Sequence, residues 1–255
     1  MVIATSGLSL SARSRAAPAK VAITSSSPFQ WNIVEKTRGL PSKATYATLD
    51  HPCGVARALD HIGERWALLI VRELLLGPKR FTDLRAGLPA ASQNVLSQRL
   101  RELEASGVLR RRRLPPPAAS QVYELTDLGH DLEPVVQALA RWGSRLPLTS
   151  TKPLSPDALM HALKSTFDPE TAGDFAGAVE LRLGDQHFLA TVSAGHLIVT
   201  RPPETTGAQA TLHTDTETLR AVVFMGEPCD NLRIEGDRQL AERFVRLFSR
   251  PPRNS

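Results

Sequence analysis

Two short segments separated by a turn constrain the fold more strongly than any other part of the chain. The first segment, residues 80–86, is followed by Gly87 and Pro89, which disfavour a continuing helix. Ser92 is a favourable N-cap for the second segment, and Gly107 after it can adopt the left-handed conformation that ends many helices. The pattern predicts a helix, a tight turn and a second helix.

The second of these helices is expected to have one apolar side and one polar side. Leu96, Leu100 and Leu103 are separated by four and three positions, so they should face the interior. Asparagine and glutamine can make paired hydrogen bonds with adenine, and arginine can do so with guanine. At about 100° per residue, the side chains that project on the opposite side are Asn94, Ser97, Gln98 and Arg101.

A basic strand is predicted directly after this helix. Residues 108–113 and 121–125 are expected to pair as two strands, joined by a turn region with three consecutive prolines. Because side chains alternate along a strand, about two of the arginines should face phosphates and about two should face away. The first strand carries Arg110, Arg111, Arg112 and Arg113.

The charge distribution favours a polyanion as the partner of this region. Residues 53–149 have a net charge of +4, whereas residues 150–255 have −3. No carboxylate occurs between Asp83 and Glu102, so we expect none on this surface to repel phosphate. Helix N-termini and nearby hydroxyls add phosphate-binding groups. The predicted contacts to double-stranded DNA are Arg80, Thr82, Ser92, Gln93, Asn94, Ser97, Gln98, Arg101, Arg110, Arg111, Arg112 and Arg113.

Other interpretations of these residues stay open. A small helical domain also has a solvated polar face, and winged helices can bind proteins. The alternative function is a lipid- or ligand-binding protein whose winged helix is a protein-interaction module. Readout groups, missing carboxylates and four arginines together favour DNA binding, although each would be weak by itself.

Further helices are predicted on both sides of this motif. Residues 54–62 should form a helix with Val55, Leu59 and Ile62 on one face, and residues 64–76 a largely buried one. A last helix, capped by Thr126, carries a narrow apolar seam typical of a helix packed against a partner helix. The residues predicted to join two copies of the chain are Leu128, Leu132, Val135, Leu139 and Trp142.

Several motifs in residues 53–143 resemble the HxlR-type winged helix-turn-helix transcription regulators of bacteria. The resemblance implies a homodimer that binds an inverted-repeat operator near its own or a neighbouring promoter. The residues that carry it run from Leu59 to Trp66, from Gly77 to Phe81, from Leu96 to Leu103, from Tyr123 to Thr126, and over Trp142 and Gly143.

The chain has two cysteines, Cys53 and Cys229, which do not form a disulfide framework and suit a reducing cytoplasm. Cys53 precedes the first predicted helix, where a helix N-terminus and Arg57 can lower the pKa of a thiol. In several relatives a cysteine at this place senses oxidants or electrophiles, so the resemblance implies a sensing role for Cys53. The other interpretation is a small, half-buried apolar residue without that role.

The C-terminal part, residues 155–250, is expected to be a smaller α+β domain after a linker at 148–154. Strands with alternating apolar residues predict a mostly antiparallel sheet. The motifs around His213, Met225 and Ile234 resemble the sterol carrier protein type of lipid-binding fold, which implies a tunnel for a small apolar ligand. The residues expected either to line this pocket or to fill a solid core are Phe175, Phe188, Val223, Phe224, Phe244 and Phe248.

The fold class predicted for the chain is therefore a mainly α winged helix-turn-helix domain at residues 51–147, followed by the α+β domain. Residues 1–50 are expected to be a disordered extension, although an organellar address has a similar composition. We expect no metal, no cofactor and no membrane span, and a cytoplasmic location. Without a nucleophile–base pair or a phosphate-binding loop, we expect no enzyme activity.

Overall fold

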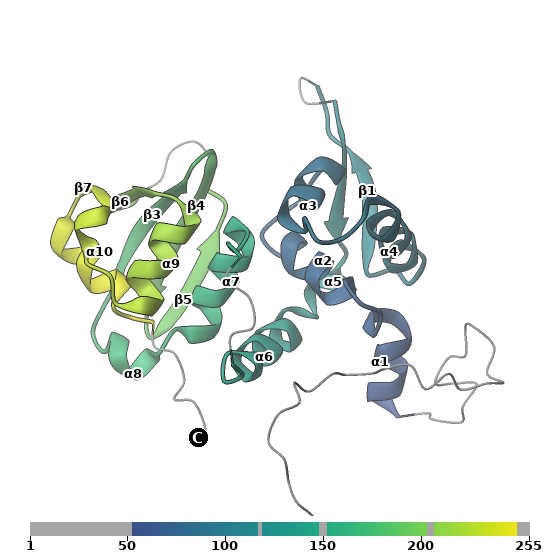
Figure 1. Ribbon diagram of the computed structural model, residues 1–255, viewed down its shortest axis with the longest axis horizontal. Helices are drawn as coiled ribbons and strands as arrows, with labels where there is room; N and C mark the ends of the chain where they lie inside the picture. Colours follow the sequence, from purple (N-terminus) through teal and green to yellow (C-terminus); the bar gives the residue numbers. More distant parts are fainter. Residues whose placement is uncertain (1–52, 117–118, 148–151, 203–206, 249–255) are drawn as a thin grey trace, which may run out of the picture. The chain divides into compact units, whose positions relative to one another are not determined.

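The computed structural model describes residues 53–116, 119–147, 152–202 and 207–248 (Figure 1). The extension predicted at residues 1–50 and most of the predicted linker lie outside these residues. Two hydrophobic clusters organise the described chain. One gathers residues between Ile62 and Val136, and the other gathers mainly residues after Leu154.

The first domain has the predicted helix, turn and helix, followed by a hairpin. Ser92 caps the second helix, and its Oγ accepts a hydrogen bond from the Val95 amide at 3.4 Å. Leu96, Leu100 and Leu103 are buried, as their spacing predicts. The elements are α1 (Gly54–Ile62), α2 (Ala67–Leu74), α3 (Phe81–Gly87), α4 (Gln93–Ala105), β1 (Leu109–Arg113) and β2 (Gln121–Leu125).

The last helix of this domain differs from the prediction, because it is broken in two. Thr126 caps α5 (Asp127–His130), and a separate helix, α6 (Glu133–Gly143), follows. Pro134 lies in the first turn of α6. Proline has no amide hydrogen to donate to a carbonyl one turn earlier, so a helix that continued through this position would lose a hydrogen bond and clash. The apolar spacing continues across the break and conceals it from a sequence pattern.

The second domain is a five-stranded sheet with helices packed against it. The strand order is β5-β4-β3-β6-β7; β3 and β6 pair in parallel and the other three pairs are antiparallel. The sheet is therefore mixed and not purely antiparallel. Its elements are α7 (Pro156–Thr166), α8 (Pro169–Ala172), β3 (Gly177–Leu183), β4 (Gln186–Ser193), β5 (His196–Thr200), β6 (Ala210–Thr214), α9 (Thr216–Met225), the 3-10 helix η1 (Cys229–Asn231), β7 (Arg233–Gly236) and α10 (Arg238–Val245).

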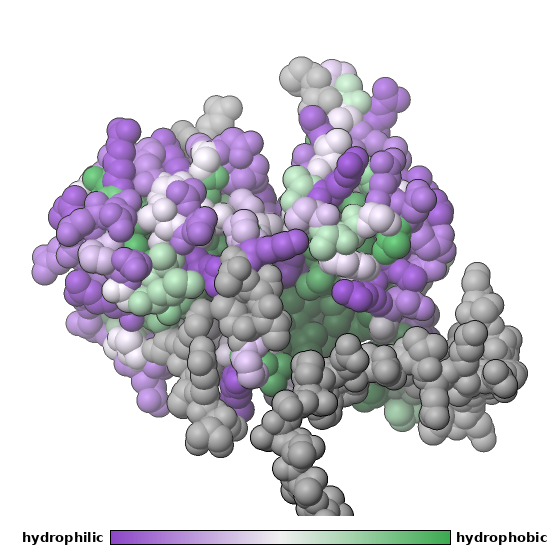
Figure 2. Space-filling model, in the orientation of Figure 1, coloured by the Kyte–Doolittle hydropathy of each residue, from purple (hydrophilic) through white to green (hydrophobic). Residues whose placement is uncertain are grey.

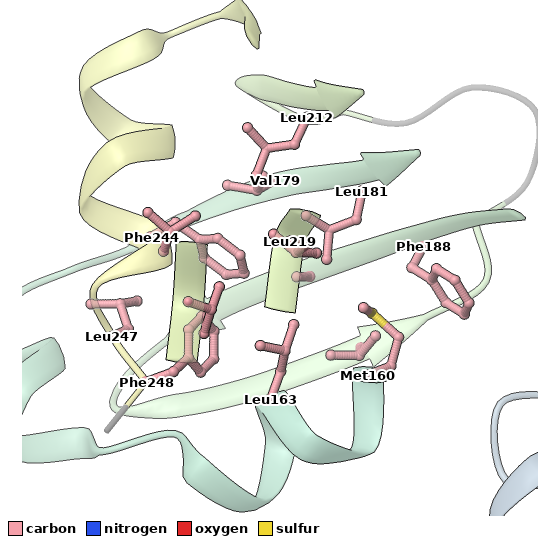
Figure 3. Packing of buried hydrophobic residues seen from close by; sticks show 14 of the residues in the cluster. Met160, Leu163, Val179, Leu181, Phe188, Leu212, Leu219, Phe244, Leu247 and Phe248 are labelled. Carbon is pink, nitrogen blue, oxygen red and sulfur yellow. The ribbon is translucent and has the colours of Figure 1, made fainter. Parts of the chain in front are cut away.

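The core of this domain lies between the sheet and its helices (Figure 3). Val179, Leu181 and Leu183 alternate along β3 and are all buried, as the sequence predicts. The helix α7 covers part of the same core and is not among the predicted elements. It begins with Ser155, whose Oγ accepts from the Ala158 amide at 3.0 Å, and with Pro156, which suits a first helical turn.

Within the described residues, no helix combines the length and the apolar character that crossing a membrane would require.

Candidate nucleic-acid interface

The polar side of α4 carries the predicted readout groups, which are either exposed or half-buried. Gln93, Asn94 and Arg101 are exposed, and Ser97 and Gln98 are half-buried. The opposite side of the helix is anchored by its three buried leucines. A helix held in this way presents amide and guanidinium groups on one face, which is the arrangement that major-groove recognition requires.

A chain of hydrogen bonds orders part of this face. Arg101 Nη2 donates to Gln98 Oε1 at 2.6 Å, and Gln98 Nε2 donates to Glu102 Oε1 at 2.7 Å. Arg99 also forms an ion pair with Glu102. The Glu102 carboxylate therefore reaches the readout surface. The expectation that no carboxylate opposes phosphate there is wrong, because the pattern of positions did not show how far the Glu102 side chain extends.

The start of α3 exposes the predicted phosphate-binding groups together with one carboxylate. Arg80 and Thr82 are exposed, and Arg80 is the N-cap residue. Asp83 Oδ2 accepts a hydrogen bond from the Arg80 amide at 3.1 Å, and Thr82 Oγ1 donates to Asp83 Oδ1 at 3.3 Å. Asp83 therefore occupies the Arg80 amide and the Thr82 hydroxyl in the free protein, and DNA would have to compete with it.

Glu124 pairs with two arginines of the hairpin at once. Arg110 Nε donates to Glu124 Oε1 and Arg112 Nε donates to Glu124 Oε2, both at 2.7 Å. Arg110 lies directly opposite Glu124 in the strand register, and Arg112 extends from the same side of β1. Burial opposes ionisation of Glu124, but the hydrogen bonds from both arginines outweigh it and lower the pKa of this carboxyl.

Arg111 and Arg113 lie on the other side of β1, so the predicted alternation of the four arginines holds. Arg111 forms a bidentate pair with Glu104, at 2.5 Å from Nη2 and 2.9 Å from Nε. Three of the four arginines thus have ion-pair partners, but only two carboxylates serve them, because Arg110 and Arg112 share Glu124; among the described residues, no ion pair is seen for Arg113. The sequence analysis predicted which way the four arginines point but did not predict that carboxylates pair with them. Figure 2 shows hydrophilic side chains along this hairpin.

A row of apolar side chains on α5 and α6 is exposed. Their exposed fractions are 57% for Leu128, 46% for Val135, 47% for Leu139 and 59% for Trp142. Leu132, the fifth residue of the predicted seam, packs partly against the core of the first domain instead. Val55 on α1 is 70% exposed. Figure 2 shows apolar surface, in green, in the region around α5. Exposure of this kind, in several neighbouring turns, is typical of a protein-binding surface.

Cys53 is the N-cap residue of α1. Its Sγ accepts a hydrogen bond from the Ala56 amide at 3.4 Å, and the residue is exposed. The exposed thiol at a helix N-terminus agrees with the position expected from the sequence. The other cysteine, Cys229, is half-buried, and burial raises the pKa of its thiol.

The aromatic residues predicted for a ligand pocket pack against one another in the second core. Phe244 contacts Phe248 edge-on with ring centroids 5.2 Å apart (Figure 3). The ring centroids of Phe175 and Phe244 are 6.4 Å apart. Two cavities lie elsewhere. One of about 430 Å³ is lined by Glu217, Thr218, Ala221, Glu227 and Asn231. The other, of about 250 Å³, is lined by Gln137, Arg141, Lys164, Phe167, Pro169, Gly195, His196 and Leu197.

Taken together, the helix-turn-helix, the hairpin and the exposed readout groups define a winged-helix protein of the nucleic-acid-binding class. Residues 61–149 match the model of the HxlR-like helix-turn-helix family. The HTH-type transcriptional regulator YvaP of Bacillus subtilis is 41% identical over 88 residues, which are 34% of this chain and 82% of YvaP. The chain therefore belongs to the HxlR-like helix-turn-helix family.

Two further comparisons cover the same part of the chain. The HTH-type transcriptional regulator YodB of Bacillus subtilis is 36% identical over 88 residues, 34% of this chain and 79% of YodB. The solved structure of reduced YodB is 33% identical, covers 38% of this chain and 97% of that chain, and has a TM-score of 0.34. The family match ends at residue 149, so the second domain lies outside it.

Proposed function

We propose that this DNA-binding transcriptional regulator acts as a homodimer on an inverted-repeat operator. The observation that carries the proposal is the polar face of α4, on which Asn94 and Arg101 are exposed and Gln98 is half-buried, while buried leucines anchor the opposite side. Amide and guanidinium groups supply the paired hydrogen bonds that distinguish adenine and guanine. Arg113 of the wing, which has no ion pair with the residues that the structure describes, supplies a guanidinium for a phosphate.

Dimerisation supplies the second half of the readout surface. The exposed row of Leu128, Val135, Leu139 and Trp142 suits a second copy of the same chain, because identical apolar helices can cover one another around a twofold axis. Two copies related in this way would present two α4 helices to half-sites about one turn of DNA apart. The operator would then have matching twofold symmetry.

A salt titration of the full chain against generic double-stranded DNA tests the proposal. DNA binding predicts measurable affinity at about 50 mM salt and a steep loss as salt rises, because each phosphate contact releases counterions. Arg238→Ala, at an exposed arginine of α10, is the charge-matched control for Arg101→Ala. An absence of binding at low salt would favour the alternative, in which the winged helix is a protein-interaction module.

For the second domain we propose a small apolar ligand, in the manner of the sterol carrier protein type of fold. The support is its mixed sheet with helices over an apolar core, in which Val223 and Phe224 of α9 take part. Phe175, Phe188, Phe244 and Phe248 would have to move apart to admit a ligand, because they are buried in contact with the rest of the core. Native mass spectrometry of the full chain would show a carried lipid as a mass increment, and its absence in repeated preparations would speak against this role.

For Cys53 we propose redox sensing, supported by its exposed position at the N-terminus of α1. Diamide treatment is expected to weaken operator binding in the natural chain but not in Cys53→Ser. Cys229→Ser is the control and should respond like the natural chain. Equal responses of all three chains would contradict redox sensing by Cys53. We propose no catalytic activity for this protein, because its relatives are named as transcriptional regulators.

A further inference from the structure

A buried group of charged side chains joins the two domains. Glu73, near the end of α2, is fully buried, and its carboxylate accepts hydrogen bonds from Lys79 Nζ at 2.7 Å and Ser155 Oγ at 2.6 Å. Lys79 Nζ also donates to Asp157 Oδ2 at 2.6 Å. Asp157, which is 1% exposed, accepts from Arg201 Nη2 at 2.9 and 3.0 Å. We call these five residues the interdomain network.

Apolar packing surrounds the interdomain network. Leu76, in the loop between α2 and α3, is buried within the core cluster of the second domain. Arg201 lies over the Phe188 ring, with its guanidinium carbon 4.6 Å from the ring centroid, and donates to Gln186 Oε1 at 2.8 Å. Charges that are buried in this way are costly to leave unpaired, so removing one partner of the Lys79–Asp157 pair should be destabilising.

Lys79 connects the interdomain network to the DNA-binding elements through its own backbone. Its amide donates to the Tyr123 carbonyl at 3.0 Å, and the Tyr123 amide donates to the Lys79 carbonyl at 2.8 Å, which ties it to β2 of the wing. The next residue, Arg80, is the N-cap of α3. One side chain thus contacts the second domain while its backbone fixes both the wing and the first helix of the helix-turn-helix.

The far end of α3 also contacts the interdomain network. A Cβ atom at Gly87, the last residue of α3, would lie 2.4 Å from Glu73 Oε2. Only glycine therefore allows the Glu73 carboxylate to approach the helix this closely. The Glu73 carboxylate therefore lies against the C-terminal end of α3, and Lys79 immediately precedes the N-cap of the same helix.

We propose that Asp157 and Arg201 of the second domain are positioning residues for DNA binding, which hold α3 and the wing in place through Lys79. This inference rests on the proposed function, because it assigns the second domain a part in presenting the DNA-binding surface. The second domain then contributes to operator recognition without touching DNA. Loss of the contact between the second domain and Lys79 would make both ends of α3 more mobile.

The test compares Asp157→Asn with Asp174→Asn in the full chain. Asp174 is a matched control, because it also pairs with an arginine of the second domain, Arg243, but its side chain is 94% exposed. Hydrogen exchange is measured without DNA on the amides of α3, β2 and β4. We expect exchange to be at least about tenfold faster in α3 and β2 of Asp157→Asn, little changed in β4, and unchanged throughout Asp174→Asn.

The second readout is the affinity for two DNA duplexes of equal length: the operator, identified by selecting bound sequences from random double-stranded DNA, and a duplex of unrelated sequence. Asp157→Asn should bind the operator at least about tenfold more weakly and unrelated DNA within about twofold of the natural chain, since its charge change is buried away from phosphates. The proposal would be overturned if a folded Asp157→Asn chain bound the operator as tightly as the natural chain and its α3 amides exchanged hydrogen at the natural rate. Equal acceleration in α3 and β4 would also overturn it, because that result indicates global loosening.

If Asp157→Asn does not fold, Arg201→Gln provides the same test, because it removes the guanidinium that holds the Asp157 carboxylate in place beside Lys79. The exchange measurement needs no DNA, so it separates the two hypotheses. A chain that binds no operator but shows the selective change in α3 and β2 would contradict the proposed function and support the positioning of α3 by Asp157 and Arg201.

Discussion

Arg101 and Gln98 lie one turn apart on α4, and the Arg101 guanidinium donates a 2.6 Å hydrogen bond to Gln98 Oε1. This contact orients both readout side chains before DNA arrives, since Gln98 is also held by Glu102. Ordering a side chain in the free protein reduces the entropy lost on binding. The two residues should therefore act as a pair in reading adjacent bases.

Arg101→Ala is expected to cost about 1–3 kcal/mol of operator affinity and to relax specificity at one base position. Fluorescence anisotropy with the operator and with single-base variants measures both quantities. Arg238→Ala should leave them unchanged. An Arg101→Ala chain with natural affinity and natural base preference would show that this guanidinium does not reach a base.

Glu124→Gln is expected to strengthen binding to unrelated DNA and to steepen its salt dependence. The substitution removes the carboxylate that Arg110 and Arg112 share, so both guanidinium groups become available to phosphates. The slope of log K against log salt should increase by about 1–2. Glu217→Gln on α9 changes the net charge equally and serves as the control. Equal slopes in the natural chain and Glu124→Gln would mean that neither arginine faces DNA.

Leu100→Ala should destabilise the first domain by about 2–5 kcal/mol, because Leu100 is 1% exposed and its truncation leaves a cavity beneath α4. Denaturant unfolding measures the loss. Val95→Ala, on the same helix but at a residue that is 38% exposed, should cost less than about 1 kcal/mol. Similar losses for both variants would contradict the assignment of the buried face.

Leu139→Glu is expected to weaken self-association at least about tenfold, because it places an unpaired carboxylate in the apolar row of α6. Sedimentation equilibrium measures the change. Ile198→Glu is the control, since Ile198 is similarly exposed on β5 of the second domain. If Leu139→Glu dimerised like the natural chain, the row would have to face something other than a second copy.

His161 should make the stability of the protein depend on pH. Burial, followed by the charges of Lys164 and Arg72, lowers the pKa of His161 from 6.5 to about 4. Between about pH 6.5 and pH 4, His161 is therefore protonated in the unfolded chain but not in the folded chain. The free energy of unfolding falls as the pH drops through this range. The loss should reach at most about 3 kcal/mol.

Denaturant unfolding of the natural chain and of His161→Gln over this pH range isolates the contribution of His161. The stability difference between the two chains should change with pH, because glutamine does not titrate. His130→Gln, at an exposed histidine, should follow the natural chain. A constant difference between the natural chain and His161→Gln would show that His161 titrates alike in the folded and unfolded states.

The sequence predicted those elements whose signals are local. Ser92, the leucine spacing and Gly107 together located α4, and the alternation of apolar residues located β3. The break between α5 and α6 was missed, because the apolar seam continues across Pro134 and its spacing resembles one helix. The helix α7 was also missed, although Ser155 and Pro156 before an apolar stripe give a recognisable helix start.

Contacts that depend on the tertiary fold could not be predicted from patterns in the sequence. Lys79 and Asp157 are 78 positions apart, and nothing in their neighbouring residues links them. The pairing of Arg110 with Glu124 was easier to predict, because the predicted hairpin already sets these residues opposite one another. A count of net charge could not reveal that three of the four arginines pair with two nearby carboxylates, Glu104 and Glu124.

Selection of bound sequences from random double-stranded DNA by the full chain tests the central claim most directly. The readout face of α4 and a dimer joined through α6 predict a palindromic consensus, with two half-sites about 10 base pairs apart from centre to centre. Recovery of no enriched sequence, or of a single half-site without symmetry, would contradict the account.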